Sequence, residues 1–123
     1  MTDILNSTIL VVDDDESNAI LIEEYLRTFK LKVIRLNSAL ECLQTMKDIP
    51  EIRIIFLDIK MPGMDGIECL KEIRRLKEDV IVIAQTAYAL YGDRERFLAE
   101  GFDDYLAKPI PRKDLTVVME KFI

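Results

Sequence analysis

The stretch that decides the fold is IIFLDIKMPGMDG, residues 54–66. Four consecutive apolar residues end abruptly at Asp58, and Pro62, Gly63 and Gly66 then turn the chain. A run that is apolar on every face is typical of a strand buried on both sides, as in a parallel sheet covered by helices above and below. Open α/β sheets place reactive groups where such strands end. Asp58 is therefore a candidate functional residue, although the first solvated residue of a loop would fit the same pattern.

The rest of the chain alternates between strand-like and helix-like patterns. Four further apolar runs predict strands, at residues 8–12, 31–36, 80–84 and 104–107. Five patterns with helical spacing predict helices, at residues 17–29, 38–46, 66–76, 87–99 and 111–122. This alternation predicts a doubly wound (βα)5 α/β fold with three layers and right-handed crossovers. We expect the flavodoxin-like strand order 2-1-3-4-5, within a single domain that spans residues 1–123.

Two of the helices carry more detailed expectations. In the second, the spacing places Leu40, Leu43 and Met46 on the inward face. The fourth contains Gly92 in its interior, which costs roughly 1 kcal/mol relative to alanine and predicts a weak helix. Gly101 is well suited to be the C-cap of that fourth helix.

Composition argues against several classes of function. The net charge is −6 with no long basic run, which argues against direct binding to nucleic acid, because such binding depends on neutralising phosphates. No apolar run approaches the ~20 residues that span a bilayer, so we expect a cytoplasmic domain without membrane contact. The two cysteines lack metal-site or redox spacing and are expected to pack in the core. The absence of histidine excludes Ser-His and Cys-His catalysis and histidine-ligated zinc.

Polar residues gather where the predicted strands end. The first strand is followed by Asp13 and Asp14, the third by Asp58, the fourth by Thr86 and the fifth by Lys108. Parallel strands share one carboxyl edge, so these side chains should lie together, and three neighbouring carboxylates repel one another unless a cation intervenes. Mg²⁺ prefers such oxygen ligands, the lysine adds a second positive charge, and an aspartate can act as a nucleophile, so the set would suit phosphoryl transfer. Each residue alone is more often an ordinary cap or loop residue, so the prediction depends on the constellation.

Together these segments resemble a response-regulator receiver domain, the phosphoacceptor module of two-component signalling. The motifs that carry the resemblance, which covers nearly the whole chain, are ILVVDDD (9–15), LDIKMPGMDG (57–66), TA (86–87) and DYLAKP (104–109). The resemblance implies that Asp58 accepts the phosphoryl group. It further implies that Asp14 ligates Mg²⁺ directly, that Asp13 assists, often through water, and that the backbone carbonyl of Lys60 supplies another ligand.

The same resemblance assigns the far side of the site. Thr86 and Lys108 would bind the phosphoryl oxygens, and the peptide bond between Lys108 and Pro109 would be cis. Tyr105 would be the switch aromatic, which turns inward as Thr86 moves toward the phosphate. The surface formed by the fourth helix, the fifth strand and the fifth helix would then carry the output of a two-state equilibrium.

The resemblance also implies the partners. A chain without histidine cannot be its own phosphohistidine donor, so the donor would be a histidine kinase or a histidine phosphotransfer domain. Residues 87–95 and 101–105 are most similar to receivers attached to hybrid sensor kinases. We therefore expect a signalling switch rather than a turnover enzyme, either stand-alone or, as we favour, one domain of a longer protein. Its output would be a downstream protein or the attached kinase.

The alternative is an aspartate-nucleophile phosphatase of the haloacid-dehalogenase type. The segment Asp13-Asp14-Asp15-Glu16-Ser17 superficially resembles its first motif, Lys108 could be its lysine, and Asp103-Asp104 could be its acidic pair. That pair should follow the lysine, however, and residues 58–66 would have no role. Phosphatase turnover that survives Asp58→Asn and is lost in Asp13→Asn would favour this alternative.

Overall fold

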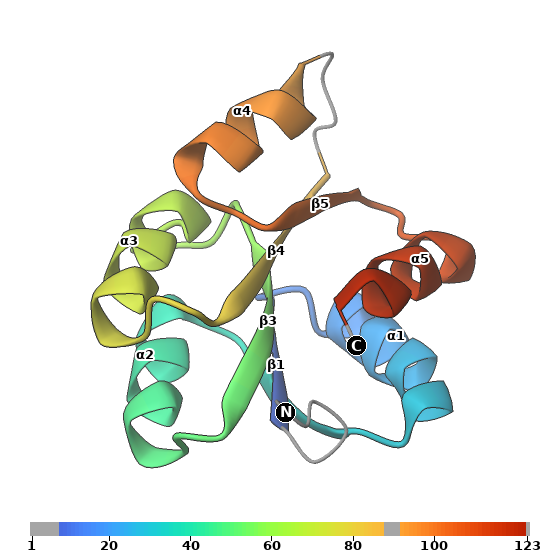
Figure 1. Cartoon of the computed structure of the whole chain (residues 1–123), viewed down its shortest axis with the longest axis horizontal. Helices are drawn as coiled ribbons and strands as arrows, with labels where there is room; N and C mark the ends of the chain where they lie inside the picture. Colours follow the sequence, from blue (N-terminus) through green and yellow to red (C-terminus); the bar gives the residue numbers. More distant parts are fainter. Residues whose placement is uncertain (1–7, 88–91, 123) are drawn as a thin grey trace.

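The computed structural model describes residues 8–87 and 92–122, which form a sheet covered by helices (Figure 1). The strands are β1 (Thr8–Val12), β2 (Lys32–Leu36), β3 (Ile52–Asp58), β4 (Ile81–Thr86) and β5 (Asp104–Ala107). The helices are α1 (Glu16–Leu26), the short 3-10 helix η2 (Arg27–Phe29), α2 (Ala39–Asp48), α3 (Gly66–Leu76), α4 (Asp93–Glu100) and α5 (Arg112–Phe122). The four strand pairings are parallel, and the order β2-β1-β3-β4-β5 confirms the predicted topology.

Helices cover both faces of the sheet. In Figure 1, α1 and α5 lie on one face and α2 and α3 on the other. Side chains alternate across a strand, so β3 sends Ile54 and Phe56 toward α1 and α5, and Ile55 and Leu57 into the opposite core. This two-sided burial is the reason for the uninterrupted apolar run before Asp58.

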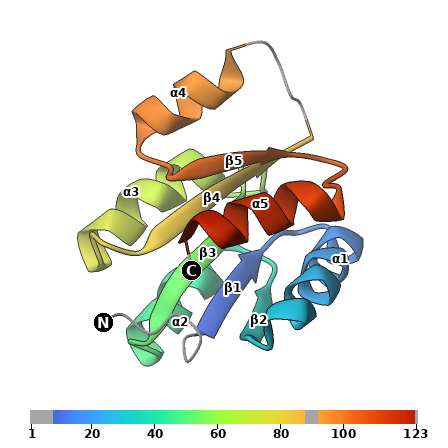
Figure 2. The ribbon, with the colours of Figure 1, turned by 45° about the vertical axis from the view of Figure 1, so that its right-hand side comes forward.

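The fourth helix lies at the edge of the sheet, beside β5 (Figure 2). Phe97 of α4 is buried, packs edge-to-face against Phe102, and joins the core on the α2–α3 side. Gly101 ends α4 in the left-handed conformation, with φ of 114°, which confirms the expected C-cap.

Two predictions for the helices were wrong. Gly92 is not inside α4 but is its N-cap, with φ of 85°, a left-handed conformation that glycine adopts without a steric penalty. Residues 88–91, which were also assigned to this helix, lie outside the described residues. In α2, Leu40 is 72% exposed. The buried face of this helix holds Cys42 and Met46, and residue 40 lies nearly opposite Cys42 on the helix, so its side chain points to solvent.

Both cysteines are free and fully buried, Cys42 in α2 and Cys69 in α3, and the contact with Cys69 together with burial raises the pKa of the Cys42 thiol. The expected packing role is therefore what the structure shows. Within residues 8–87 and 92–122, no helix combines the length and the apolar character that crossing a bilayer requires.

Candidate functional site

The carboxyl ends of the central strands bring the predicted side chains to one edge of the sheet. Asp58, the last residue of β3, pairs with Gln85 of β4. Asp13 follows β1, the strand on the other side of β3. Beyond β5, the Lys108 N–H donates a hydrogen bond of 2.8 Å to the carbonyl of Thr86. Parallel pairing thus collects residues that lie far apart in the sequence.

The three consecutive aspartates after β1 have three different environments. Asp13 is 1% exposed, and its Oδ1 accepts a hydrogen bond of 2.9 Å from the Asp15 N–H. Asp14 is exposed. Asp15 is the N-cap of α1, where its Oδ1 accepts the N–H groups of Ser17 and Asn18. One acid is therefore buried at the site, one faces solvent, and one starts the helix.

Lys108 lies between two of the buried acids. Its Nζ is 2.9 Å from Asp13 Oδ2 and 3.3 Å from Asp58 Oδ1. Burial alone would lower the pKa of Lys108, but the contacts with Asp13 and Asp58 outweigh it and raise the pKa. The lysine is thus held protonated, as the positive charge within the acidic group.

Asp58 has an unusually high proton affinity for an aspartate. It is 4% exposed, and burial together with the nearby charge of Asp13 raises its pKa to about 7, although Lys108 acts in the opposite direction. One lysine therefore does not compensate the buried negative charge, and a further cation would favour the ionised form of Asp58.

The donor set fits a hard divalent cation. Carboxylate oxygens of Asp13, Asp14 and Asp58 all lie within 4.8 Å of one another. Oxygen-only ligands with an exposed member suit Mg²⁺, which binds one or two carboxylates and keeps several waters. Lys60 is exposed in the loop after β3, two residues beyond Asp58, and its role as a carbonyl ligand stays a prediction.

The loop after β3 is held tightly against the site by Gly66, the first residue of α3. A Cβ atom at this position would lie 2.5 Å from the carbonyl oxygen of Asp58 and 2.8 Å from Cα of Ile59. The Gly66 N–H donates to the Ile59 carbonyl at 2.8 Å, and Asp65 caps α3. Only glycine allows this approach, which fixes both ends of the loop that contains Lys60.

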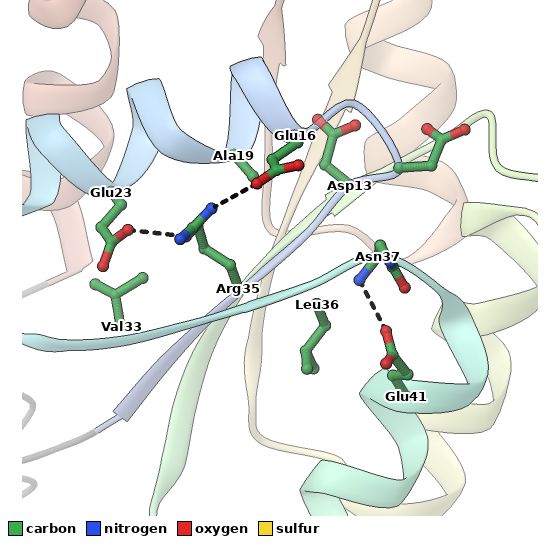
Figure 3. A pocket seen from close by; sticks show the side chains of 10 residues that line it. Asp13, Glu16, Ala19, Glu23, Val33, Arg35, Leu36, Asn37 and Glu41 are labelled. Carbon is green, nitrogen blue, oxygen red and sulfur yellow. Dashed lines mark hydrogen bonds and ion pairs between the residues drawn. The ribbon is translucent and has the colours of Figure 1, made fainter.

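Beside the acids lies a hollow of about 500 Å³ between α1, the end of β2 and the start of α2 (Figure 3). Asp13 lies at one end of this hollow. Arg35 of β2 also lines it, and the Arg35 guanidinium lies 2.9 Å from Glu23 and 3.8 Å from Glu16 of α1. Glu41 also lines the hollow and accepts a hydrogen bond from a backbone N–H. Acidic groups dominate this lining, so the carboxylate edge faces a solvent region that attracts cations.

Comparison with known proteins identifies the family. Residues 9–120 match the response regulator receiver domain. The chain belongs to this family.

Three relatives illustrate the similarity. The signal transduction histidine-protein kinase BarA of Escherichia coli K12 is 37% identical over 113 residues, which cover 90% of this chain. This chain spans only 12% of the length of BarA. The receiver domain of the sensor histidine kinase PA1611 of Pseudomonas aeruginosa, solved with magnesium in its active-site cleft, is 33% identical with a TM-score of 0.82, over 95% of this chain and 97% of that chain. The Ssk1 receiver complex with the histidine phosphotransfer protein Ypd1 of Saccharomyces cerevisiae gives 27% identity and a TM-score of 0.80, over 90% and 84% of the chains.

The residues implied as the switch of this receiver lie on adjacent strands. Thr86, the last residue of β4, is 4% exposed. Tyr105 of β5 is half-buried, and its ring stacks on Phe97 of α4 with 5.5 Å between the ring centroids. The peptide bond between Lys108 and Pro109 is cis.

The acidic pair that a phosphatase would need does not face the receiver site. Asp103 accepts hydrogen bonds from Arg74, at 2.9 Å, and from the Val82 N–H, at 2.8 Å. Asp104 contacts Arg94 and Lys121. Asp103 is therefore held by partners from α3 and β4, and Asp104 by partners from α4 and α5, which removes the acidic pair from the alternative.

Sequence reasoning missed two buried amides of the receiver. Asn18 Nδ2 donates to Asp13 Oδ2 at 2.6 Å and to Gln85 Oε1 at 3.0 Å. A signal was present in the sequence: Asn18 lies on the same turn of α1 as buried Ala19, and Gln85 interrupts an otherwise apolar strand just before Thr86.

Proposed function

We propose that this receiver accepts a phosphoryl group on Asp58 from a phosphohistidine of a partner protein, in a step that depends on Mg²⁺. The observation that carries the proposal is the position of Asp58, a buried carboxyl within 4.8 Å of Asp13 and Asp14 oxygens and 3.3 Å from Lys108 Nζ. Burial and the charge of Asp13 raise the pKa of Asp58 to about 7, so a bound divalent cation would favour the ionised carboxylate that attacks phosphorus.

The chemistry follows from these contacts. A carboxylate oxygen of Asp58 attacks phosphorus as the bond from phosphorus to the imidazole nitrogen breaks, and that nitrogen keeps the electron pair. Asp13, Asp14 and the carbonyl of Lys60 would hold Mg²⁺, which when bound neutralises charge on the phosphoryl oxygens. Lys108 exchanges one of its carboxylate contacts for a phosphoryl oxygen.

The output would travel from Thr86 to Tyr105. The Thr86 hydroxyl moves toward the new phosphoryl group, and Tyr105 turns into the space that this movement opens. Support for the coupling comes from the pairing of β4 with β5, in which Ala84 lies opposite Tyr105 and Thr86 opposite Ala107. Phosphorylation then shifts a two-state equilibrium of the α4–β5–α5 surface.

The phosphodonor is a histidine kinase or a histidine phosphotransfer domain. Support comes from BarA, a histidine kinase by name, and from the solved complex of a receiver with the phosphotransfer protein Ypd1. The output partner is a downstream protein or an attached kinase. Two free buried cysteines are compatible with work in the reducing cytoplasm.

Incubation with acetyl phosphate, with and without Mg²⁺, followed by intact-mass measurement tests the proposal. The wild-type protein should gain the mass of one phosphoryl group only with Mg²⁺, and Asp58→Asn should gain none. Asp79→Asn, which alters an exposed aspartate in the turn before β4, is the matched control and should behave as wild type. An equal gain in Asp58→Asn would overturn the assignment.

A further inference from the structure

Asn18 is the most buried polar side chain of α1 and lies directly beside the acidic site. It is 9% exposed, and its single amide nitrogen donates to both Asp13 Oδ2 and Gln85 Oε1. The N-cap Asp15 accepts the Asn18 backbone N–H, which fixes where this side chain begins. Asn18 is therefore held both at its backbone N–H and at its side-chain amide nitrogen.

Gln85 supplies the other end of this bridge. It is fully buried on β4, two residues after Ile83, so it faces the same layer as α1 and α5. Its Oε1 accepts from Asn18, whereas its Nε2 has no hydrogen-bond partner among the described residues. A buried donor without a partner costs folding free energy that an apolar residue at this position would not. The amide pair is thus a poor choice for stability alone.

We propose that Asn18 is a positioning residue of the receiver site, anchored by Gln85, and that it fixes the Asp13 carboxylate in the orientation that binds Mg²⁺. The inference rests on the proposed function, because it concerns the metal side of that site. Asp13 is held at Oδ1 by the Asp15 N–H and at Oδ2 by Asn18 and Lys108. When Lys108 turns to a phosphoryl oxygen, the Asp15 N–H still holds Oδ1, and Asn18 is the neutral donor that still holds Oδ2.

The expected effect is on metal affinity rather than on folding. A hydrogen bond that orients a ligating carboxylate typically changes metal affinity by about tenfold or more when it is removed. Replacing both amides by leucine removes the donor and its acceptor together, and with them the unpaired Nε2 of Gln85. The double variant should therefore keep its thermal stability while its affinity for Mg²⁺ falls.

The test measures the Mg²⁺ dissociation constant by isothermal titration calorimetry and the thermal unfolding midpoint without metal. Asn18→Leu should lower the midpoint by about 3–8 °C, because it leaves Gln85 without any partner, and should weaken Mg²⁺ binding about tenfold. In Asn18→Leu/Gln85→Leu the midpoint should return to the wild-type value or above, while Mg²⁺ binding stays about tenfold weaker. Gln44→Leu, which removes an exposed amide of α2, is the control and should not change the dissociation constant.

A dissociation constant in the double variant within twofold of wild type would overturn the inference and leave the amides a folding role only. Asn18→Ala, measured at low temperature where a destabilised variant is still folded, gives the same decision without the bulk of leucine: about tenfold weaker binding supports the proposal and unchanged binding overturns it. A wild-type protein that binds no Mg²⁺ would instead contradict the proposed function itself.

Discussion

Asp58 and Asp104 are equally buried, each 4% exposed, yet their surroundings shift their pKa values in opposite directions. Burial and the charge of Asp13 raise the pKa of Asp58 to about 7, although Lys108 opposes the change. Burial would also raise the pKa of Asp104, but the Tyr105 N–H and two basic side chains outweigh it and lower the pKa. Burial acts in the same direction on both carboxyl groups, so their neighbours decide the direction of each net shift.

The difference lies in how each carboxylate is compensated. Asp104 of β5 accepts the Tyr105 N–H at 2.8 Å, Arg94 of α4 at 2.8 Å and Lys121 of α5 at 3.1 Å. Asp58 shares one lysine with a second buried acid. Asp104 is therefore an ion-paired carboxylate that connects β5 with α4 and α5, whereas the charge of Asp58 is offset by a lysine that it shares with Asp13.

The largest effect is expected from removing Lys108, the lysine that contacts both Asp13 and Asp58. Lys108→Ala should slow phosphorylation by acetyl phosphate by about 100-fold or more at saturating Mg²⁺, because a donor to the developing phosphoryl charge is lost. Intact-mass time courses measure the rate. Lys113→Ala, at an exposed position of α5, is the control and should keep the wild-type rate. A wild-type rate in Lys108→Ala would contradict the role of this lysine.

The second prediction is that replacing the buried Asp58 stabilises the protein, whereas replacing a buried polar residue usually destabilises one. Without metal, Asp58→Asn should stabilise the protein by about 2 kcal/mol at pH 8, measured by urea unfolding in the presence of a chelator. The folded-state pKa of about 7 lies above the unfolded value, so the wild-type protein loses stability as the pH rises toward 7. The gain from the substitution should accordingly shrink between pH 8 and pH 5. A destabilised Asp58→Asn protein at pH 8 would refute this reading of the site.

The smallest effect is expected at the other aspartate. Asp104→Asn should destabilise the protein by about 1 kcal/mol, since Arg94 and Lys121 are each about half exposed and solvent screens their loss. The pKa of Asp104 is lowered by folding, so its contribution is present above the unfolded pKa and is lost only as the pH falls through the folded value. The same urea experiments should give an equal loss at pH 5 and pH 8. A loss that disappears by pH 5 would remove the contrast with Asp58.

Much of the fold was predictable because the deciding signals are local. Strands buried on two sides appear as uninterrupted apolar runs, and their first polar residues, such as Asp58, mark the sheet edge that carries the candidate site. The strand order then brings Asp13 and Lys108 to Asp58, as was expected. Position along the chain was sufficient for these residues.

The remainder depends on contacts between distant segments. Three adjacent aspartates look equivalent in sequence, and only the packing of α1 makes Asp13 a buried ligand candidate and Asp15 a cap. The place of Asn18 beside the site depends on its contacts with Asp13 and with Gln85 of β4, which the sequence alone does not show. Likewise, the inward face of α2 was misassigned at Leu40, because helical spacing alone does not fix which side of an apolar stripe faces the sheet.

The central claim is that Asp58 is the phosphoacceptor, and trapping of the acyl phosphate tests it most directly. The protein is phosphorylated with acetyl phosphate and Mg²⁺, reduced with borohydride, digested and sequenced by mass spectrometry. Borohydride converts an aspartyl phosphate to homoserine, which marks the modified position. The account predicts homoserine at position 58, with Asp13 and Asp14 unchanged. Homoserine at position 13, as the phosphatase alternative would give, or at neither position, would contradict it.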